Sequence, residues 1–219
     1  DALAVSFDNH VGHDYLEDYE ERFESYHRKE SRIKFDLELF NKITKGGLPN
    51  KTLNIALAGT GVGKSLFMCH HASSVLLDGK NVLYITLEMA EEKIAERIDA
   101  NLLNVNIQNI TELPKPMFES KVNNLTKKTQ GTLIIKEYPT ASAHSGHFKS
   151  LLNELALKKS FTPDIIFIDY LNICASSRYR TNNNVNSYSY IKAIAEELRG
   201  LAVEANVPIV SATQTTRSG

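Results

Sequence analysis

The sequence lacks any run of about eighteen apolar residues, the length that a helix needs to cross a bilayer, so we expect no membrane-spanning segment. It has only two cysteines, Cys69 and Cys174, and both lie among apolar residues. Such cysteines are typical of buried, reduced thiols in an intracellular protein. None of the seven histidines stands beside a second ligand cluster with the spacing of a zinc site, so we expect structural or surface histidines.

No signal peptide is recognisable at the start, and the first residue is not Met, so we expect part of a longer chain. The 219 residues, 42% of them hydrophobic, suffice for one α/β domain with additional chain. Residues 1–30 carry nine acidic and three basic side chains, whereas residues 31–219 carry seventeen and twenty-two. The charges predict an acidic arm, 1–30, before a mildly basic domain, 31–219, whose charge is compatible with nucleic-acid binding.

The segment 58–65, Ala-Gly-Thr-Gly-Val-Gly-Lys-Ser, follows an apolar run and opens a predicted helix, which is the context of a phosphate-binding P-loop. Lys64 is expected to reach the β- and γ-phosphates, and the Ser65 hydroxyl to bind Mg²⁺. Ala58 stands where the usual pattern has Gly, and a small residue still permits the turn. The alternative is a glycine-rich turn without a ligand. The predicted nucleotide-binding residues are Gly59, Thr60, Gly61, Val62, Gly63, Lys64 and Ser65.

Continuous apolar runs alternate with segments of helical periodicity along the chain. We predict strands at 53–57, 82–87, 132–138, 165–169 and 209–214. We predict helices at 15–28, 37–43, 65–77, 91–103, 117–129, 147–160 and 188–206. Runs that are apolar throughout, and not in alternate positions, indicate an α/β fold whose mainly parallel sheet is covered by helices on both faces.

Polar residues end three of the predicted strands, where ligands of open parallel sheets collect. Asp169 resembles a Walker B aspartate and is predicted to hold Mg²⁺. The next residue is Tyr170, where many P-loop ATPases have a catalytic glutamate, so Glu88 becomes the predicted base that activates water. Gln214 is predicted to sense the γ-phosphate. The alternatives are that Glu88 caps the helix beginning near Ala90 and that Gln214 is a simple strand-end residue.

The loop at 175–187 carries Arg178 and Arg180 with Tyr179 between them, among Ser and Asn residues. Basic, amide and aromatic side chains together suit a single-stranded nucleic-acid backbone. From these residues alone, a solvated surface loop is the better-supported alternative.

In the acidic arm, aromatic side chains recur at helical spacing. The stripe consists of Tyr15, Tyr19, Phe23 and Tyr26. A helix of this length is marginal alone in water, so the stripe requires a surface, either its own domain or a neighbouring subunit.

Taken together, these motifs resemble the RecA-like motor domain of DnaB-type hexameric replicative DNA helicases, bacteriophage members in particular. The resemblance covers essentially the whole chain. It rests on the lead-in 33–48, the P-loop 58–65, Leu-Glu-Met at 87–89, the Walker B segment 168–171 and the strand 211–214. It implies that Glu88 is the catalytic glutamate, that Gln214 senses the γ-phosphate, that 175–187 is a DNA-binding loop in a central channel, and that helix 15–28 docks on the adjacent subunit.

The resemblance further implies an ATP-dependent helicase that uses ATP or another NTP with Mg²⁺. The implied partners are single-stranded DNA, five further copies in a homo-hexamer, a primase and a helicase-loading protein, in the cytoplasm of the host cell if the source is viral. The family's arginine finger is expected beyond Gly219. Another RecA-like ATPase, such as a recombinase or a repair or clock ATPase, and a nucleotide-gated assembly module without motor activity are the alternatives.

Overall fold

The computed structural model describes residues 12–28, 30–179 and 186–214. It separates the chain into two compact units, residues 1–31 and residues 32–219. The strands are β1 (Arg32–Ile33), β2 (Leu48–Pro49), β3 (Leu53–Ala58), β4 (Val82–Thr86), β5 (Leu133–Glu137), β6 (Ile165–Asp169) and β7 (Ile209–Gln214). The helices are α1 (Tyr19–His27), α2 (Glu38–Ile43), α3 (Lys64–Leu77), α4 (Glu91–Leu102), α5 (Ile107–Ile110), α6 (Lys115–Thr126), α7 (Ser145–Lys159), the 3₁₀ turn η1 (Leu171–Ile173) and α8 (Ser187–Ala205).

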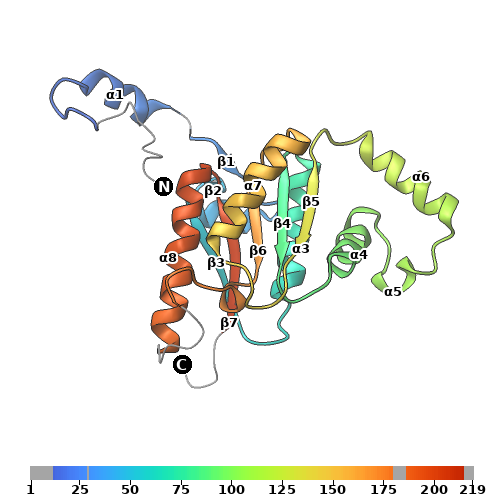
Figure 1. Ribbon diagram of the computed structural model, residues 1–219. Helices are drawn as coiled ribbons and strands as arrows, with labels where there is room; N and C mark the ends of the chain where they lie inside the picture. The colour runs from blue at the N-terminus through green and yellow to red at the C-terminus, as the bar shows by residue number, and fades with distance from the viewer. Residues whose placement is uncertain (1–11, 29, 180–185, 215–219) are drawn as a thin grey trace. The chain divides into compact units, whose positions relative to one another are not determined.

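The larger unit is built on a five-stranded sheet in the order β3-β7-β6-β4-β5, and each pair of neighbouring strands is parallel (Figure 1). The predicted α/β fold with a mainly parallel sheet is therefore confirmed. A separate antiparallel pair, β1 with β2, precedes it. Among the described residues, no helix has both the length and the apolar character needed to cross a bilayer.

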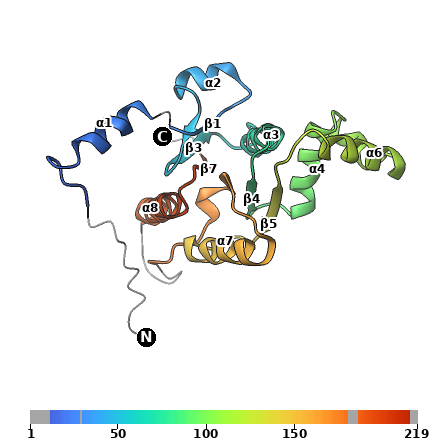
Figure 2. The same cartoon turned by 90° about the horizontal axis from the view of Figure 1, so that it is seen from above.

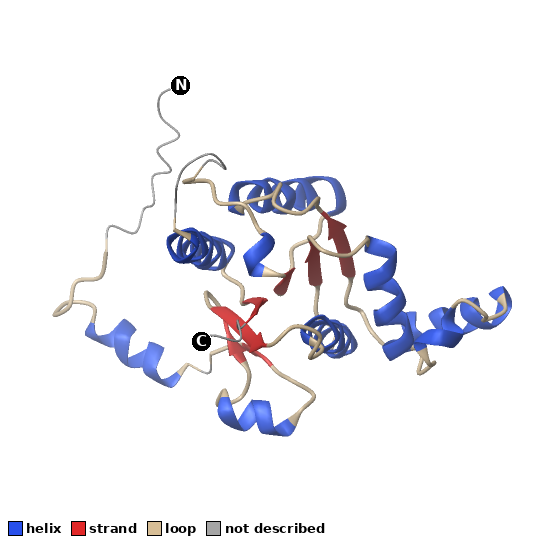
Figure 3. Ribbon diagram, turned by 90° about the horizontal axis from the view of Figure 1, so that it is seen from below, coloured by secondary structure: helices blue, strands red, loops and turns tan. Residues whose placement is uncertain are grey.

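Helices cover both faces of the sheet, as Figures 2 and 3 show from two opposite directions. On one face, α3 and α4 bury Met68, Val75 and Ile94 against Tyr84 and Phe167 of the sheet. The other face packs against α7 and α8. Every residue of β4 and of β6 is buried, because these central strands have helices on both sides. Burial on both faces explains why their sequences are continuous apolar runs.

The arm contains α1, and its beginning differs from the prediction. The helix starts at Tyr19, because residues 15–18 form a turn instead, in which the Asp14 carboxylate accepts the N–H groups of Leu16 and Glu17 at 2.9 Å. The aromatic stripe lies largely exposed within this unit. The exposed fractions are 74% for Tyr15, 59% for Tyr19, 63% for Phe23 and 75% for Tyr26.

Candidate nucleotide-binding and catalytic site

The P-loop between β3 and α3 has glycine where its backbone requires it. Gly61 and Gly63 have φ values of 74° and 100°, in the left-handed region that residues with a Cβ rarely adopt. Gly63 also caps α3, so the unpaired amides of the first helical turn open toward the loop. Ala58 is the last residue of β3 and pairs with Gln214 in extended backbone. The Ala in place of the usual Gly is therefore compatible with the loop.

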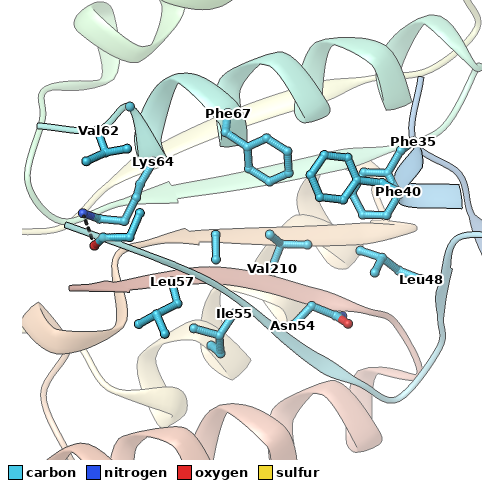
Figure 4. Close-up of a pocket in the computed structure, with 13 residues that line it drawn as sticks. Phe35, Phe40, Leu48, Asn54, Ile55, Leu57, Val62, Lys64, Phe67 and Val210 are labelled. Carbon is cyan, nitrogen blue, oxygen red and sulfur yellow. Dashed lines mark hydrogen bonds between the residues drawn. The ribbon is translucent and has the colours of Figure 1, made fainter. Parts of the chain in front are cut away.

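Lys64 opens α3, and its side chain folds back over the P-loop. Its Nζ donates to the carbonyl oxygens of Gly59 at 2.7 Å and Ala58 at 3.1 Å, and Figure 4 shows the second contact. Both acceptors are neutral, and a phosphate oxygen forms a stronger, charge-assisted bond with an ammonium group. The lysine is thus held beside the loop amides, where an anion can draw it away from these carbonyls.

The parallel register brings the predicted site residues to one edge of the sheet. Asp169, which ends β6, pairs with Thr86, which ends β4. Gln214, which ends β7, pairs with Ala58 at the start of the P-loop. Because all these strands run in the same direction, their carboxyl ends and the N-terminus of α3 meet at this edge.

Glu88 lies beyond the end of β4, whereas the sequence analysis placed it at the strand end. The strand stops at Thr86 because its hydroxyl closes a tight turn: Oγ1 donates to the Met89 carbonyl at 2.8 Å and accepts the Met89 N–H at 3.2 Å. Helix α4 begins after Ala90, which makes no side-chain cap, and the N–H of its first residue, Glu91, donates to the Glu137 carboxylate of β5 at 3.1 Å. The alternative that Glu88 caps this helix is therefore wrong.

Asp169 is almost fully buried, with 1% of its surface exposed. Burial raises the pKa of its carboxyl above the usual value, while the Ser65 and Tyr84 hydroxyls act in the opposite direction. Tyr84 donates to Oδ2 at 3.0 Å, and Oδ1 has no hydrogen-bond partner among the described residues. A carboxylate oxygen without a partner, near a hydroxyl, is the oxygen donor set that hard divalent cations take, so these residues fit Mg²⁺.

A cavity of about 290 Å³ joins these elements. It is lined by all five predicted acid–base, sensing and metal-binding side chains: Lys64, Ser65, Glu88, Asp169 and Gln214. Residues separated by up to 150 positions in the chain therefore line one space.

Arg97 lines the same cavity, although the sequence analysis did not single it out. It is half-buried in α4, and its charge favours the ionised form of Asp169. Among the described residues its guanidinium has no hydrogen-bond or ion-pair partner. The available sequence signal was a basic residue within the buried stripe of an amphipathic helix, between Ile94 and Ile98.

A second cavity, of about 420 Å³, adjoins the P-loop on the side of the edge strand β3, and no carboxylate lines it (Figure 4). Its walls include Phe35, Phe40, Phe67, Ile55 and Leu57. Lys64 lines both cavities. Of these two cavities, only the smaller one is therefore lined by carboxylates that could act in acid–base chemistry.

Of the two arginines predicted to bind DNA, Arg178 lies at the surface and forms an ion pair with Glu196 of α8. Arg180 lies outside the described residues. The predicted role of both arginines stays a prediction.

The root of the predicted DNA loop, residues 175–178, is anchored by Glu197 of α8. Its carboxylate accepts the Ser176 hydroxyl at 2.6 Å, the Ser145 hydroxyl of α7 at 3.1 Å, and the Ser177 N–H at 3.0 and 3.1 Å. On the side of the sheet, Thr213 of β7 donates to the Asn172 side chain in η1 at 2.7 Å. Sequence reasoning missed both contacts, which join residues far apart in the chain.

A glycine loop between strand and helix, with carboxylates at the neighbouring ends of a parallel sheet, defines a RecA-like P-loop nucleotide-binding domain. Residues 33–219 match the DnaB-like helicase C terminal domain, and the chain belongs to this family. The predicted family and fold are thereby confirmed.

Relatives agree with this assignment. The DnaB-like replicative helicase of Enterobacteria phage T4 is 50% identical over 216 residues, which cover 97% of this chain and 45% of that protein. A probable plasmid replicative DNA helicase of Chlamydia psittaci is 30% identical over 169 residues, covering 74% of this chain and 34% of the relative. The chain thus spans less than half the length of these relatives.

Solved structures share the fold. A DnaB-like replicative helicase, solved with its interactions with primase, gives a TM-score of 0.70 at 18% identity and covers 91% of this chain and 47% of that one. A second solved structure, that of an ATPase domain, gives the same TM-score and identity, covering 91% of this chain and 69% of that one.

Proposed function

We propose that this chain is the ATP-hydrolysing motor core of a replicative DNA helicase, which unwinds duplex DNA by translocating on a single strand as a ring of six subunits. The observation that carries the proposal is the single cavity lined by Lys64, Ser65, Glu88, Asp169 and Gln214. The identity to the replicative helicase of phage T4 supports it.

In this proposal, the amides of residues 59–65 and the Lys64 ammonium bind the phosphates of ATP or another NTP. Ser65 and Asp169 hold Mg²⁺, in keeping with the buried Asp169 oxygen that has no hydrogen-bond partner among the described residues. Bound Mg²⁺ would neutralise charge on the phosphate oxygens during hydrolysis.

Glu88 acts as the general base. Its carboxylate lines the cavity, and among the described residues it neither caps a helix nor forms an ion pair. Gln214 contributes a neutral amide that can hydrogen-bond the γ-phosphate and loses this bond after hydrolysis. Arg97 adds a fixed positive charge near the reacting phosphate, which stabilises charge that develops in the transition state.

Arg178 and Arg180 contact phosphates of the DNA strand in the proposed channel. For single strands, log affinity falls with log salt by about 0.7 per neutralised phosphate. Replacing both with Ala should therefore lower the slope by about 1.4 per engaged subunit, if each makes one contact. Lys158→Ala, which removes a lysine paired with Glu154 on α7, is the matched control. An unchanged slope would assign the DNA path to other residues.

The arm is proposed to dock its aromatic stripe on the adjacent subunit, because each of these four side chains is more than half exposed within its own unit. Deleting residues 1–30 should then reduce the hexamer population measured by light scattering at matched concentration. Equal populations would contradict this role. A primase and a helicase-loading protein complete the proposed partners, in line with the solved helicase that interacts with primase. Replication places the protein in the cytoplasm, that of the host if the source is viral.

ATPase and forked-duplex unwinding assays on the complete gene product, with and without single-stranded DNA, test the proposal. A helicase hydrolyses ATP faster when DNA is present and separates the fork. A recombinase would coat the strand without unwinding it, and an assembly module would bind nucleotide without turnover. Either of these last results would contradict the proposed function.

A further inference from the structure

We propose that Tyr84 is a positioning residue, whose hydroxyl fixes the Asp169 carboxylate so that one oxygen is kept for a divalent cation. This inference rests on the proposed nucleotide site and adds a residue to it. Tyr84 lies in the middle of β4, away from the strand end, and its side chain is fully buried. It donates to Asp169 Oδ2 at 3.0 Å, across the pair of neighbouring strands β4 and β6.

The aromatic ring of Tyr84 is held rigidly. It stacks on Phe167 of β6, with ring centroids 5.7 Å apart and an interplanar angle of 14°. Packing of this kind would be satisfied equally by Phe, because the ring lies in an apolar cluster that includes Met68 and Ile94. Burying a hydroxyl without a hydrogen-bond partner is unfavourable. The presence of a hydroxyl at this position is therefore explained by its hydrogen-bond partners and not by packing.

Only two described groups meet the phenol oxygen. The Cys69 thiol of α3 donates to it across 3.7 Å, and the Asp169 carboxylate accepts from it. Because the thiol supplies a hydrogen to the oxygen, the phenol's own hydrogen is directed to Asp169. The donor and acceptor roles along this buried chain are therefore consistent from α3 through β4 to β6.

The consequence for Asp169 is an inequality between its two oxygens. Oδ2 is occupied by Tyr84, whereas Oδ1 is buried and has no hydrogen-bond partner among the described residues. A hydrogen bond to one oxygen fixes the orientation of a carboxylate. Groups that hydrogen-bond to metal ligands commonly orient those ligands in this way. The phenol would thus select which oxygen faces the cation held with Ser65.

Tyr84→Phe removes the hydroxyl and keeps the ring. We expect the affinity of the nucleotide-loaded chain for Mn²⁺, followed by electron paramagnetic resonance with a non-hydrolysable ATP analogue, to fall by about 10–100-fold. The affinity for a fluorescent ATP analogue, measured without metal, should stay within about threefold of the affinity of the unsubstituted chain, because the phosphate-binding amides and Lys64 are unchanged. Tyr138→Phe is the matched control, since this partly buried tyrosine on the chain after β5 packs edge-to-face on Phe148 and its hydroxyl makes no described hydrogen bond.

Circular dichroism and the melting temperature establish that the variants are folded. If Tyr84→Phe is not folded, Tyr84→Met, which also fills the site without a hydroxyl, provides the same comparison. Unchanged Mn²⁺ affinity in a folded variant would overturn the positioning role and leave the nucleotide site intact. Equal weakening of metal-free nucleotide binding would also overturn it, since that result indicates general loss of packing. Absence of Mn²⁺-nucleotide binding in the unsubstituted chain would instead refute the proposed site itself.

Discussion

Replacing Glu197 with Gln removes the negative charge that anchors the root of the loop at 175–187. In the folded chain this carboxylate receives the hydroxyls of Ser145 and Ser176 and the N–H of Ser177. It therefore joins α7, the loop root and α8 through three donors. Gln keeps the size and one acceptor oxygen, but it loses the charge and brings an NH₂ group to a place surrounded by donors.

The magnitude follows from these contacts. A hydrogen bond to a charged group contributes about 1.5–3 kcal/mol to stability, and this contribution is lost when the charged partner is removed. The serine hydroxyls can rotate toward the amide oxygen or water, whereas the Ser177 N–H is fixed by the backbone. We therefore expect Glu197→Gln to lower the free energy of unfolding by about 1–2 kcal/mol and Glu197→Ala, which leaves every donor unpaired, by about 2–4 kcal/mol.

The same contacts set the sign of the pH dependence. Burial acts to raise the pKa of Glu197, but the hydrogen bonds from Ser176, Ser177 and Ser145 outweigh it and hold this pKa below its usual value. A depressed pKa means that the stabilisation is fully present above the unfolded pKa, about 4.3, and is lost as pH falls through the folded pKa. The difference between Glu197 and Gln should thus be largest near neutral pH and shrink below about pH 4.

Urea unfolding at pH 7 measures the loss, and amide hydrogen exchange at Ser177 measures the local release. Glu196→Gln is the control on the adjacent residue. Its ion pair with Arg178 is exposed on both sides, so we expect a change within about 0.5 kcal/mol. The reasoning is refuted if both variants unfold at the same urea concentration and the Ser177 amide exchanges no faster in Glu197→Gln.

Three further substitutions probe the nucleotide site and its connection to the loop. Lys64→Ala removes the cation beside the P-loop amides and should abolish useful MgATP binding; native affinity for labelled nucleotide would contradict the phosphate site. Glu88→Gln should bind nucleotide normally but lower turnover in the assembled ring by about 10²–10⁴-fold, and normal turnover would assign the base to another residue. Thr213→Val removes the hydrogen bond to Asn172 and should preserve basal turnover while reducing stimulation by single-stranded DNA; full stimulation would exclude this contact from the coupling.

The fold could be predicted from the sequence because its central strands, buried on both faces, are continuous apolar runs, and because the P-loop fixes one strand–helix junction. Strand order could not be predicted. The adjacency of β3 and β7, which brings Gln214 beside Ala58, depends on pairing between segments about 155 residues apart. The arm helix was predicted to start too early because aromatic periodicity continues through a turn that the Asp14 carboxylate stabilises.

The site residues likewise include some that the sequence could predict and some that it could not. Lys64, Ser65 and Asp169 stand in local motifs, so their placement was predictable. Tyr84 gave no signal, because a tyrosine within an apolar strand is an ordinary core residue until the neighbouring strand is known. Arg97 likewise gains its meaning only when α4 is placed beside the strand ends.

The contacts around the strand ends also suggest how the proposed sensing by Gln214 can reach the DNA loop. Gln214 follows Thr213, whose hydroxyl is bonded to Asn172 in the 3₁₀ turn directly after the Asp169 strand. That turn leads within three residues to the loop root. At the start of the root, the Ala175 N–H donates a hydrogen bond to the Ala143 carbonyl at 2.8 Å. A change in hydrogen bonding at Gln214 would therefore act on β7 next to Thr213, which holds the Asn172 hydrogen bond. Glu197 holds the loop root to α8 through Ser176 and Ser177. Since the anchored root can move only together with its contacts, the proposed coupling requires a concerted shift of η1 and the loop root, and loosening either end should reduce it.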